Sequence, residues 1–236
     1  MIEPIVFLPG MMSDARVFAP QINDLSREFP VHVANYADAE NIRNMARAVT
    51  DNAPERFALV GHSMGGIVAM EVLRRAPERV TRVALLSTSP LSETPKEAAW
   101  REPLIARARA GYLDDVIGET MNVENLAPDS ERAGLMRLMR EMAQGLGTET
   151  YIRQSRALQR RRDSQSVLIS TKTATLILCG IFDRLTPVKR HEAMAELVAH
   201  SELVVLENAG HLPMLEAPEE VNAALRVWMA RPLMLR

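Results

Sequence analysis

The sequence predicts an α/β protein in which a mostly parallel sheet of about six strands is interrupted by one helical insertion. Short runs made only of apolar residues alternate with segments whose apolar residues recur at helical spacing. This alternation is typical of a parallel sheet that helices cover on both faces. It stops at residue 91 and resumes at residue 171, so we expect a core of residues 1–90 and 171–236 and a helical cap of residues 91–170.

Each predicted element follows from the local pattern of residues. Apolar runs that end in glycine, proline or polar residues predict strands over residues 5–8, 31–34, 57–60, 83–86, 175–179 and 203–206. Apolar residues at three- and four-residue spacing predict helices over residues 41–52, 67–75, 188–199 and 218–230. Residues 91–170 predict no strand, and proline and glycine residues divide them into several helices.

The composition is that of an ordinary globular chain and excludes several classes of protein. Of the 236 residues, 47% are hydrophobic and 25% are charged, and the formal net charge is −2. The chain therefore has no overall basic field for nucleic acid, and its single cysteine can form no internal disulfide. No apolar stretch is long enough for a membrane span, and the N-terminus lacks the basic start of a signal peptide. We expect a cytoplasmic protein.

Residues 61–65 match the pattern G-x-S-x-G, with Ser63 at its centre. They lie directly between a predicted strand and a predicted helix, so Ser63 would occupy a sharp turn above the edge of the sheet. Glycine on both sides relieves the crowding of such a turn, and the N-terminus of the helix lies below the hydroxyl. This context predicts a nucleophilic serine rather than an ordinary serine in a packing turn.

A serine nucleophile needs a base, and His211 is the histidine whose position fits that role. It follows the predicted strand 203–206, which places it at the same edge of the sheet as Ser63. The other histidines have simpler expected places. We expect His32 in the core, His62 at the variable position of the turn, and His191 and His200 on a solvated helix face.

The base in turn needs a carboxylate that orients it, and Asp183 has the expected position. Asp183 follows the predicted strand 175–179 and precedes a predicted helix. The chain order Ser63, Asp183, His211 is the order expected for this kind of turn. The alternative is that Asp183 caps the helix that follows or pairs with Arg184.

The oxyanion formed during acyl transfer needs two donors, and both are expected to be backbone N–H groups. One is the N–H of Met64, which follows the nucleophile, and the other is the N–H of Met11 in the loop after the first strand. Met12 and Met214 are expected to wall an apolar substrate pocket beside them. The alternative is that these methionines are ordinary core residues, in a chain that has 14 methionines.

Four segments together resemble the α/β-hydrolase superfamily: residues 8–10, residues 61–66, the loop that carries Asp183, and residues 208–211. The resemblance covers roughly residues 4–90 and 172–232, and it implies the α/β-hydrolase fold with a helical cap inserted after the family's sixth strand. Two features depart from the family pattern. Pro9 and Gly10 stand where the family usually has His-Gly, and the family's first antiparallel hairpin is missing because Ile5 begins what resembles its third strand.

A finer resemblance concerns the cap. Residues 147–150, followed by Arg153, Arg156 and residues 157–158, are similar to the cap of carboxylesterases that cleave pimeloyl-carrier-protein methyl ester. In that family the cap arginines engage the acidic carrier protein, so the resemblance implies such a partner here. The charge agrees, because residues 132–163 carry 8 arginines and 3 acids whereas residues 91–131 carry 4 bases and 9 acids. The alternative is that Arg160, Arg161 and Arg162 form a solvated helix end.

These features together predict a serine hydrolase that cleaves a carboxylic ester, a thioester or a lactone of a small or acyl-chain substrate through an acyl-enzyme. In the resembling superfamily, dehalogenases and epoxide hydrolases carry aspartate at the turn, which argues against those activities. The sequence has no metal-ligand pattern and no phosphate loop, so no cofactor is expected. The alternatives are a carrier-protein-linked methyl ester esterase, a C–C hydrolase or perhydrolase, and a non-hydrolytic ligand receptor.

Overall fold

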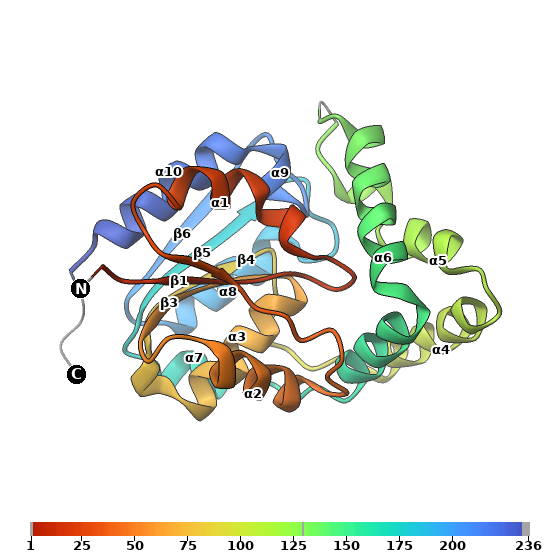
Figure 1. Cartoon of the computed structure of the whole chain (residues 1–236), viewed down its shortest axis with the longest axis horizontal. Helices are drawn as coiled ribbons and strands as arrows, with labels where there is room; N and C mark the ends of the chain where they lie inside the picture. Colours follow the sequence, from red (N-terminus) through yellow and green to blue (C-terminus); the bar gives the residue numbers. More distant parts are fainter. Residues whose placement is uncertain (1, 129, 233–236) are drawn as a thin grey trace.

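A computed structural model describes residues 2–128 and 130–232 of the chain. Six strands form one sheet in the order β2-β1-β3-β4-β5-β6 (Figure 1), and within the described residues every pairing in it is parallel. The strands are β1 (Ile5–Leu8), β2 (Val31–Val33), β3 (Phe57–His62), β4 (Val80–Leu86), β5 (Ala174–Gly180) and β6 (Ser201–Leu206). The predicted α/β class is confirmed. The predicted core limits at residues 1 and 233–236 lie outside the described residues.

Helices cover both faces of the sheet (Figure 1). One face carries α1 (Ala19–Leu25), α9 (Pro213–Glu216) and α10 (Pro218–Ala230), and the other carries α2 (Ile42–Asn52), α3 (Met64–Arg75), α7 (Gln165–Ser170) and α8 (Val188–Leu197). Alternate residues of β1 enter the two cores, since Ile5 and Phe7 face α1 and α10 whereas Val6 and Leu8 face α2 and α3. The short 3-10 helices are η1 (Ala15–Phe18), η2 (Pro77–Arg79) and η3 (Val123–Asn125).

The strands differ in burial between the centre and the edges of the sheet. Every residue of β1, β3 and β5 is buried, as expected for runs of apolar residues covered on both faces. All of β2 and most of β6 are only half-buried, because each is an edge strand with one neighbour. His32 lies in β2 and is therefore half-buried, in contrast to the expected core position.

Between β4 and β5, three helices stand at the end of the sheet (yellow-green to green in Figure 1). We call α4 (Pro95–Arg109), α5 (Leu113–Thr120) and α6 (Arg132–Gln159) the cap helices. The 28 residues of α6 bend at Gly147, where φ is 80°. Met12 joins the apolar cluster that the cap helices form, so this cluster ties the cap to the loop after β1. None of the helices described for residues 2–128 and 130–232 has the length and apolarity of a membrane span.

The structure extends several predicted elements at their polar or glycine-containing ends. Helix α3 begins at Met64 rather than at residue 67. The prediction began too late because the first turn contains two glycines, which have low helix propensity. Strand β4 begins at Val80 and includes Arg82, which is buried against Glu3 at 2.9 Å. Helix α8 ends at Leu197, two residues before the predicted end. Helices α1 and α9 were not predicted, since both are short.

Candidate active site

The turn between β3 and α3 holds Ser63 in a backbone conformation that few non-glycine residues adopt. Its φ is 51° and its ψ is −115°, a strained combination that costs about 1–3 kcal/mol. The turn also requires glycine on both sides. A Cβ atom at Gly61 would lie 2.5 Å from the carbonyl oxygen of Gly65, and one at Gly65 would collide with the carbonyl oxygen of Leu8. The strand-turn-helix context expected for residues 61–65 is therefore present.

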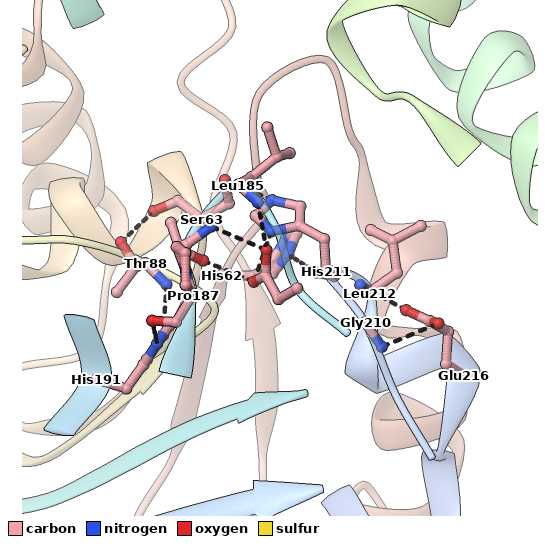
Figure 2. A network of polar contacts seen from close by, with 12 residues as sticks. His62, Ser63, Thr88, Leu185, Pro187, His191, Gly210, His211, Leu212 and Glu216 are labelled. Carbon is pink, nitrogen blue, oxygen red and sulfur yellow. Dashed lines mark hydrogen bonds and ion pairs between the residues drawn. The ribbon is translucent and has the colours of Figure 1, made fainter. Parts of the chain in front are cut away.

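The structure brings the three predicted side chains together at the carboxyl edge of the sheet. Figure 2 labels Ser63 and His211 of this set. The Nε2 atom of His211 lies 3.1 Å from the Oγ of Ser63, and its Nδ1 atom lies 2.9 Å from the Oδ2 of Asp183. Asp183 and His211 are both 2% exposed, whereas Ser63 is half-buried and faces a cavity. This arrangement can move a proton from the serine hydroxyl to the imidazole while a carboxylate stabilises the resulting imidazolium.

Asp183 is held as an ionised acceptor. Its carboxylate accepts hydrogen bonds from the N–H groups of Leu185 and Thr186, both at 2.9 Å, and from the hydroxyl of Thr186 at 2.6 Å. Burial alone would raise the pKa of Asp183, but the His211 ring and the Thr186 donors outweigh it and lower that pKa to about 2. These donors belong to the loop before α8. The same carboxylate therefore holds this loop in place and contacts His211.

The loop that carries His211 is fixed by Glu216, a residue that the sequence reasoning missed. The Glu216 carboxylate accepts hydrogen bonds from the N–H groups of Gly210 at 3.0 Å, Leu212 at 2.8 Å and Ala127 at 2.6 Å (Figure 2 draws the first two). Burial raises the pKa of Glu216. Its signal in the sequence is weak, because an acid in the first turn after a proline is common in any helix.

Two further histidines support the site, and the sequence assigned neither of them this role. His62 is buried and its Nε2 lies 2.8 Å from the carbonyl oxygen of His211. Burial lowers the pKa of His62 to about 3, so this ring is neutral at pH 7 and donates to that carbonyl through Nε2. His191, expected on a solvated helix face, is instead fully buried. Its Nε2 accepts from the N–H of Thr88 at 3.1 Å, and the Thr88 hydroxyl donates to the carbonyl of Ser63 at 2.7 Å.

The expected position of His191 was wrong because helix α8 buries the face that carries it against β5 and Thr88. His200 is exposed as expected, although it lies in a turn after α8 rather than in a helix. The two differences have separate causes. The side of a helix on which a histidine lies is hard to predict because histidine is neither clearly apolar nor clearly polar, which explains His191. His200 lies outside the helix because α8 ends at Leu197.

The two predicted oxyanion donors are available. Within the described part of the chain, no acceptor lies in hydrogen-bond range of the N–H of Met11 or of Met64. The N–H of Met12 is different, since it donates to the Oε1 of Gln154 in α6 at 2.8 Å. The hydroxyl of Tyr36 donates to the carbonyl of Pro9 and so supports the loop that carries Met11.

Ser63 and His211 open into a cavity of about 250 Å³ between the sheet and the cap helices. Its lining is largely apolar and includes Met11, Met12, Met64, Met121, Met139, Trp100 and Tyr151, together with charged side chains described below. Met214 is absent from this lining and is fully buried in the apolar cluster beneath α1 and α10. Its place there corrects the expectation that Met214 walls the pocket. Helix α9 turns its side chain toward the core rather than toward the cavity.

A model described as "Alpha/beta hydrolase family" matches residues 5–224 of the chain. The chain belongs to this family. The putative carbamate hydrolase RutD of Yersinia enterocolitica is 25% identical to it, over 94% of this chain and 86% of that protein. The pimeloyl-[acyl-carrier protein] methyl ester esterase of Vibrio parahaemolyticus is 24% identical, over 94% of this chain and 92% of that protein.

Among solved structures, a thermophilic esterase from Thermogutta terrifontis with bound malate is similar throughout. The TM-score is 0.86 at 26% identity, over 96% of this chain and 89% of that chain. The α/β-hydrolase fold predicted from the sequence is confirmed by this similarity and by the family model. The family and these relatives support a hydrolase of the esterase type.

Proposed function

We propose that the protein is a serine esterase that hydrolyses a carboxylic ester, a thioester or a lactone through an acyl-enzyme on Ser63. The observation that carries the proposal is the unbroken line of contacts from the Ser63 hydroxyl through both nitrogens of His211 to Asp183, at 3.1 Å and 2.9 Å. A serine hydroxyl is a weak nucleophile, and a base held in this way is what activates it.

In the proposed mechanism, Ser63 attacks the carbonyl carbon of the ester while the Nε2 of His211 accepts its proton. The oxyanion is held by the N–H groups of Met11 and Met64. His211 then gives the proton to the departing alcohol, which leaves the acyl group on Ser63. Water activated by His211 attacks this acyl-enzyme and releases the acid. Asp183 stays ionised throughout and keeps the His211 ring in the required tautomer.

The cavity favours a small substrate with an apolar part. Its volume of about 250 Å³ suits a short or medium acyl chain more than a bulky ester. The methionines that line it have flexible side chains, which accommodate acyl chains of different shapes. Trp100 is 44% exposed at the cavity and offers an apolar surface where a longer chain leaves the site.

The test is turnover of p-nitrophenyl esters of increasing acyl length by the wild type and by Ser63→Ala. We expect turnover by the wild type and a loss of about 10⁴-fold or more in kcat in the variant. Ser89→Ala is the matched control, because Ser89 also lines the cavity but bonds to Leu91. A fluorophosphonate should add once, at Ser63. Labelling at a different serine would refute the assignment.

A wider set of substrates distinguishes the esterase from the other functions considered: a ligand receptor, a C–C hydrolase and a perhydrolase. A wild type that binds substrate-like ligands but turns over no ester, thioester or lactone supports a ligand receptor and contradicts the esterase proposal. A C–C hydrolase would cleave a β-diketone while leaving simple esters intact. A perhydrolase would form peracid from an ester only when hydrogen peroxide is present.

A carrier-protein-linked methyl ester is a second candidate substrate, favoured by the name of the Vibrio parahaemolyticus relative and by the arginines of α6. Arg153 pairs with Asp38 at 3.3 Å and Arg156 pairs with Glu102, so both are occupied within the chain. Arg160 and Arg162 are exposed and are better placed to meet an acidic carrier protein.

The change that tests this partner is the double variant Arg160→Glu, Arg162→Glu. We expect it to raise KM for a carrier-linked methyl ester about 10-fold or more and to leave turnover of a small ester unchanged. Arg27→Glu is the control, because Arg27 is exposed in the turn after α1, on the face of the sheet opposite α3 and α7. Equal effects on both substrates would reject the carrier protein as a partner.

A further inference from the structure

Charged side chains gather at the end of the active-site cavity where the cap helices meet the core. Among the described residues, those that line this end are Glu93, Glu97, Arg101, Arg161 and Arg190. Charged groups are unusual in the wall of a pocket that is otherwise apolar, because desolvating them is costly unless each has a partner.

Two of the three guanidinium groups have a carboxylate. The Nε and Nη2 atoms of Arg101 both donate hydrogen bonds to the carboxylate of Glu93, the shorter at 2.6 Å. Both side chains are largely buried. Arg190 faces Glu97 at 3.7 Å. Glu97 also accepts the N–H of Thr94 at 2.7 Å, at the start of α4. Both carboxylates are therefore occupied.

Arg161 is the guanidinium that remains. Among residues 2–128 and 130–232, no carboxylate or other acceptor contacts its side chain, and its Nε is shielded from solvent without a hydrogen-bond partner. The Arg161 side chain lines this cavity, and the charges that act on it come from the other four residues of the group. Burial lowers its pKa to about 10, so it is still charged at pH 7.

Since two carboxylates face three guanidiniums, this end of the cavity has one positive charge in excess. Arg161 is half-buried, and a shielded Nε without a hydrogen-bond partner lowers the stability of the free protein. It is understandable as part of a binding site, because a ligand anion that enters the cavity would balance the charge and gain charge-assisted hydrogen bonds.

We propose that Arg161 is an anion-recognition residue, and that the substrate of this esterase carries a carboxylate at the end remote from the ester group. The inference rests on the proposed function, since it assigns a substrate class to the same cavity. Ser63, His211 and Arg161 line the same cavity, so one molecule can present its ester to the first two and its carboxylate to the third. The carboxylate belongs either to the acyl part or to the alcohol part.

Two pairs of esters test the proposal, each pair differing only by a carboxylate in place of a methyl group. Monomethyl adipate against methyl hexanoate places the anion in the acyl part. The ester 4-acetoxybutanoate against butyl acetate places it in the alcohol part. For at least one pair we expect the wild type to prefer the anionic ester by about 10- to 100-fold in kcat/KM, mainly through a lower KM.

The variant Arg161→Gln should abolish this preference and leave turnover of the neutral esters within about twofold. Arg162→Gln is the matched control, because Arg162 is the exposed neighbour and does not line the cavity. Arg161→Lys keeps the charge without the planar fork and should retain part of the preference. The Tm of Arg161→Gln should equal or exceed that of the wild type, since an unpaired charge is removed. A structural role would lower it.

A wild type with no preference in either pair, or a preference that survives in Arg161→Gln, would overturn the anion site and leave the esterase function intact. If no ester is turned over at all, the esterase proposal fails, and binding still decides the anion site. Calorimetry on Ser63→Ala would then compare the same ester pairs, monomethyl adipate with methyl hexanoate and 4-acetoxybutanoate with butyl acetate. Stronger binding of an anionic ester that is lost when Arg161→Gln is added supports the site, and equal binding of its neutral partner contradicts it.

Discussion

On the core side of the cavity, hydrogen bonds hold the side chains that accept the proton of Ser63. Asp183 accepts four hydrogen bonds, and the His211 loop is held by Glu216 and by His62. On the cap side, Glu93 pairs with Arg101 and Glu97 with Arg190, whereas the Arg161 side chain has no partner among the residues that the structure describes. The core side can therefore present its reactive groups before any ligand arrives. The cap side becomes complete only with a ligand.

This difference suits the core side to the chemical steps and the cap side to the selection of substrates. Chemistry common to ester hydrolysis needs atoms fixed to within a fraction of an ångström, and buried, fully bonded groups provide that. Selection among substrates needs groups whose bonding changes when the right molecule binds. We therefore expect variants on the core side to change kcat and stability, and variants on the cap side to change KM and substrate preference.

The largest effect is expected at Asp183. Asp183→Asn should lower kcat by about 10⁴-fold, because the amide no longer stabilises the imidazolium of His211. The folded carboxyl has a pKa of about 2, below the unfolded value of about 3.9. Its stabilising contribution is thus complete above pH 4 and is lost as the pH falls toward 2. In urea unfolding at pH 5, 4 and 3, the stability gap between wild type and variant should narrow with falling pH. Asp115→Asn, at an exposed position, should show no such trend.

Alanine substitutions at one glycine of each region should have opposite effects on stability. Gly65→Ala should destabilise the protein by about 3 kcal/mol or more, since the new methyl group would collide with the carbonyl oxygen of Leu8. Gly145 lies in α6 with no atom within 4 Å of an added Cβ. Gly145→Ala should be stabilising by about 0.5–1 kcal/mol through better helix propensity. Thermal denaturation of both variants is the measurement, and a similar loss in both would contradict the comparison.

The bridge between the two regions is Glu216. Glu216→Gln removes the charge that accepts three backbone N–H groups, one of them from Ala127 next to the cap. We expect a loss of about 2 kcal/mol in stability and roughly a 10-fold decrease in kcat as the His211 loop shifts. Glu219→Gln, at an exposed position of α10, is the control. An increase in KM with kcat unchanged would mean that Glu216 acts on substrate binding instead.

The smallest of the expected losses is at the second bridge, where Gln154 accepts the N–H of Met12. Gln154→Ala should cost about 1–2 kcal/mol, because that buried N–H is left without an acceptor. The control Gln144→Ala removes an exposed contact to Asp114 and should change stability by less than about 0.5 kcal/mol. Fluorophosphonate labelling of Ser63 should slow in Gln154→Ala if the Met11 loop moves with Met12.

The catalytic side of the cavity was readable from the sequence because its constraints are local. Gly61 and Gly65 are required by the backbone of one turn, and Asp183 and His211 follow predicted strands whose ends meet at one edge of the sheet. Parallel strands with buried apolar runs made those edges predictable. The same reasoning predicted that the central strands are parallel and buried on both faces, but it did not predict the order of the strands in the sheet.

The supporting residues could not be predicted, because their partners lie far away in the sequence. Glu216 meets Ala127 across 89 residues, and His191 meets Thr88 across 103. Met214 was expected with the other methionines at the apolar pocket, but it lies in the core beneath α1 and α10. In the cap, Arg161 was one arginine in a run of three, and only the folded arrangement distinguishes it from Arg160 and Arg162.

Exchanging the cap for that of another hydrolase is an obvious route to a new specificity. The hydrogen bonds between the cap and the core limit which caps can be used. The carbonyl of Asn125 accepts the N–H of His211 at 2.7 Å, and Gln154 accepts the N–H of Met12. A transplanted segment must therefore supply an acceptor at each of these two places. A graft that matches only the shape of the core would loosen the general base and the oxyanion loop together, and activity would fall on every substrate.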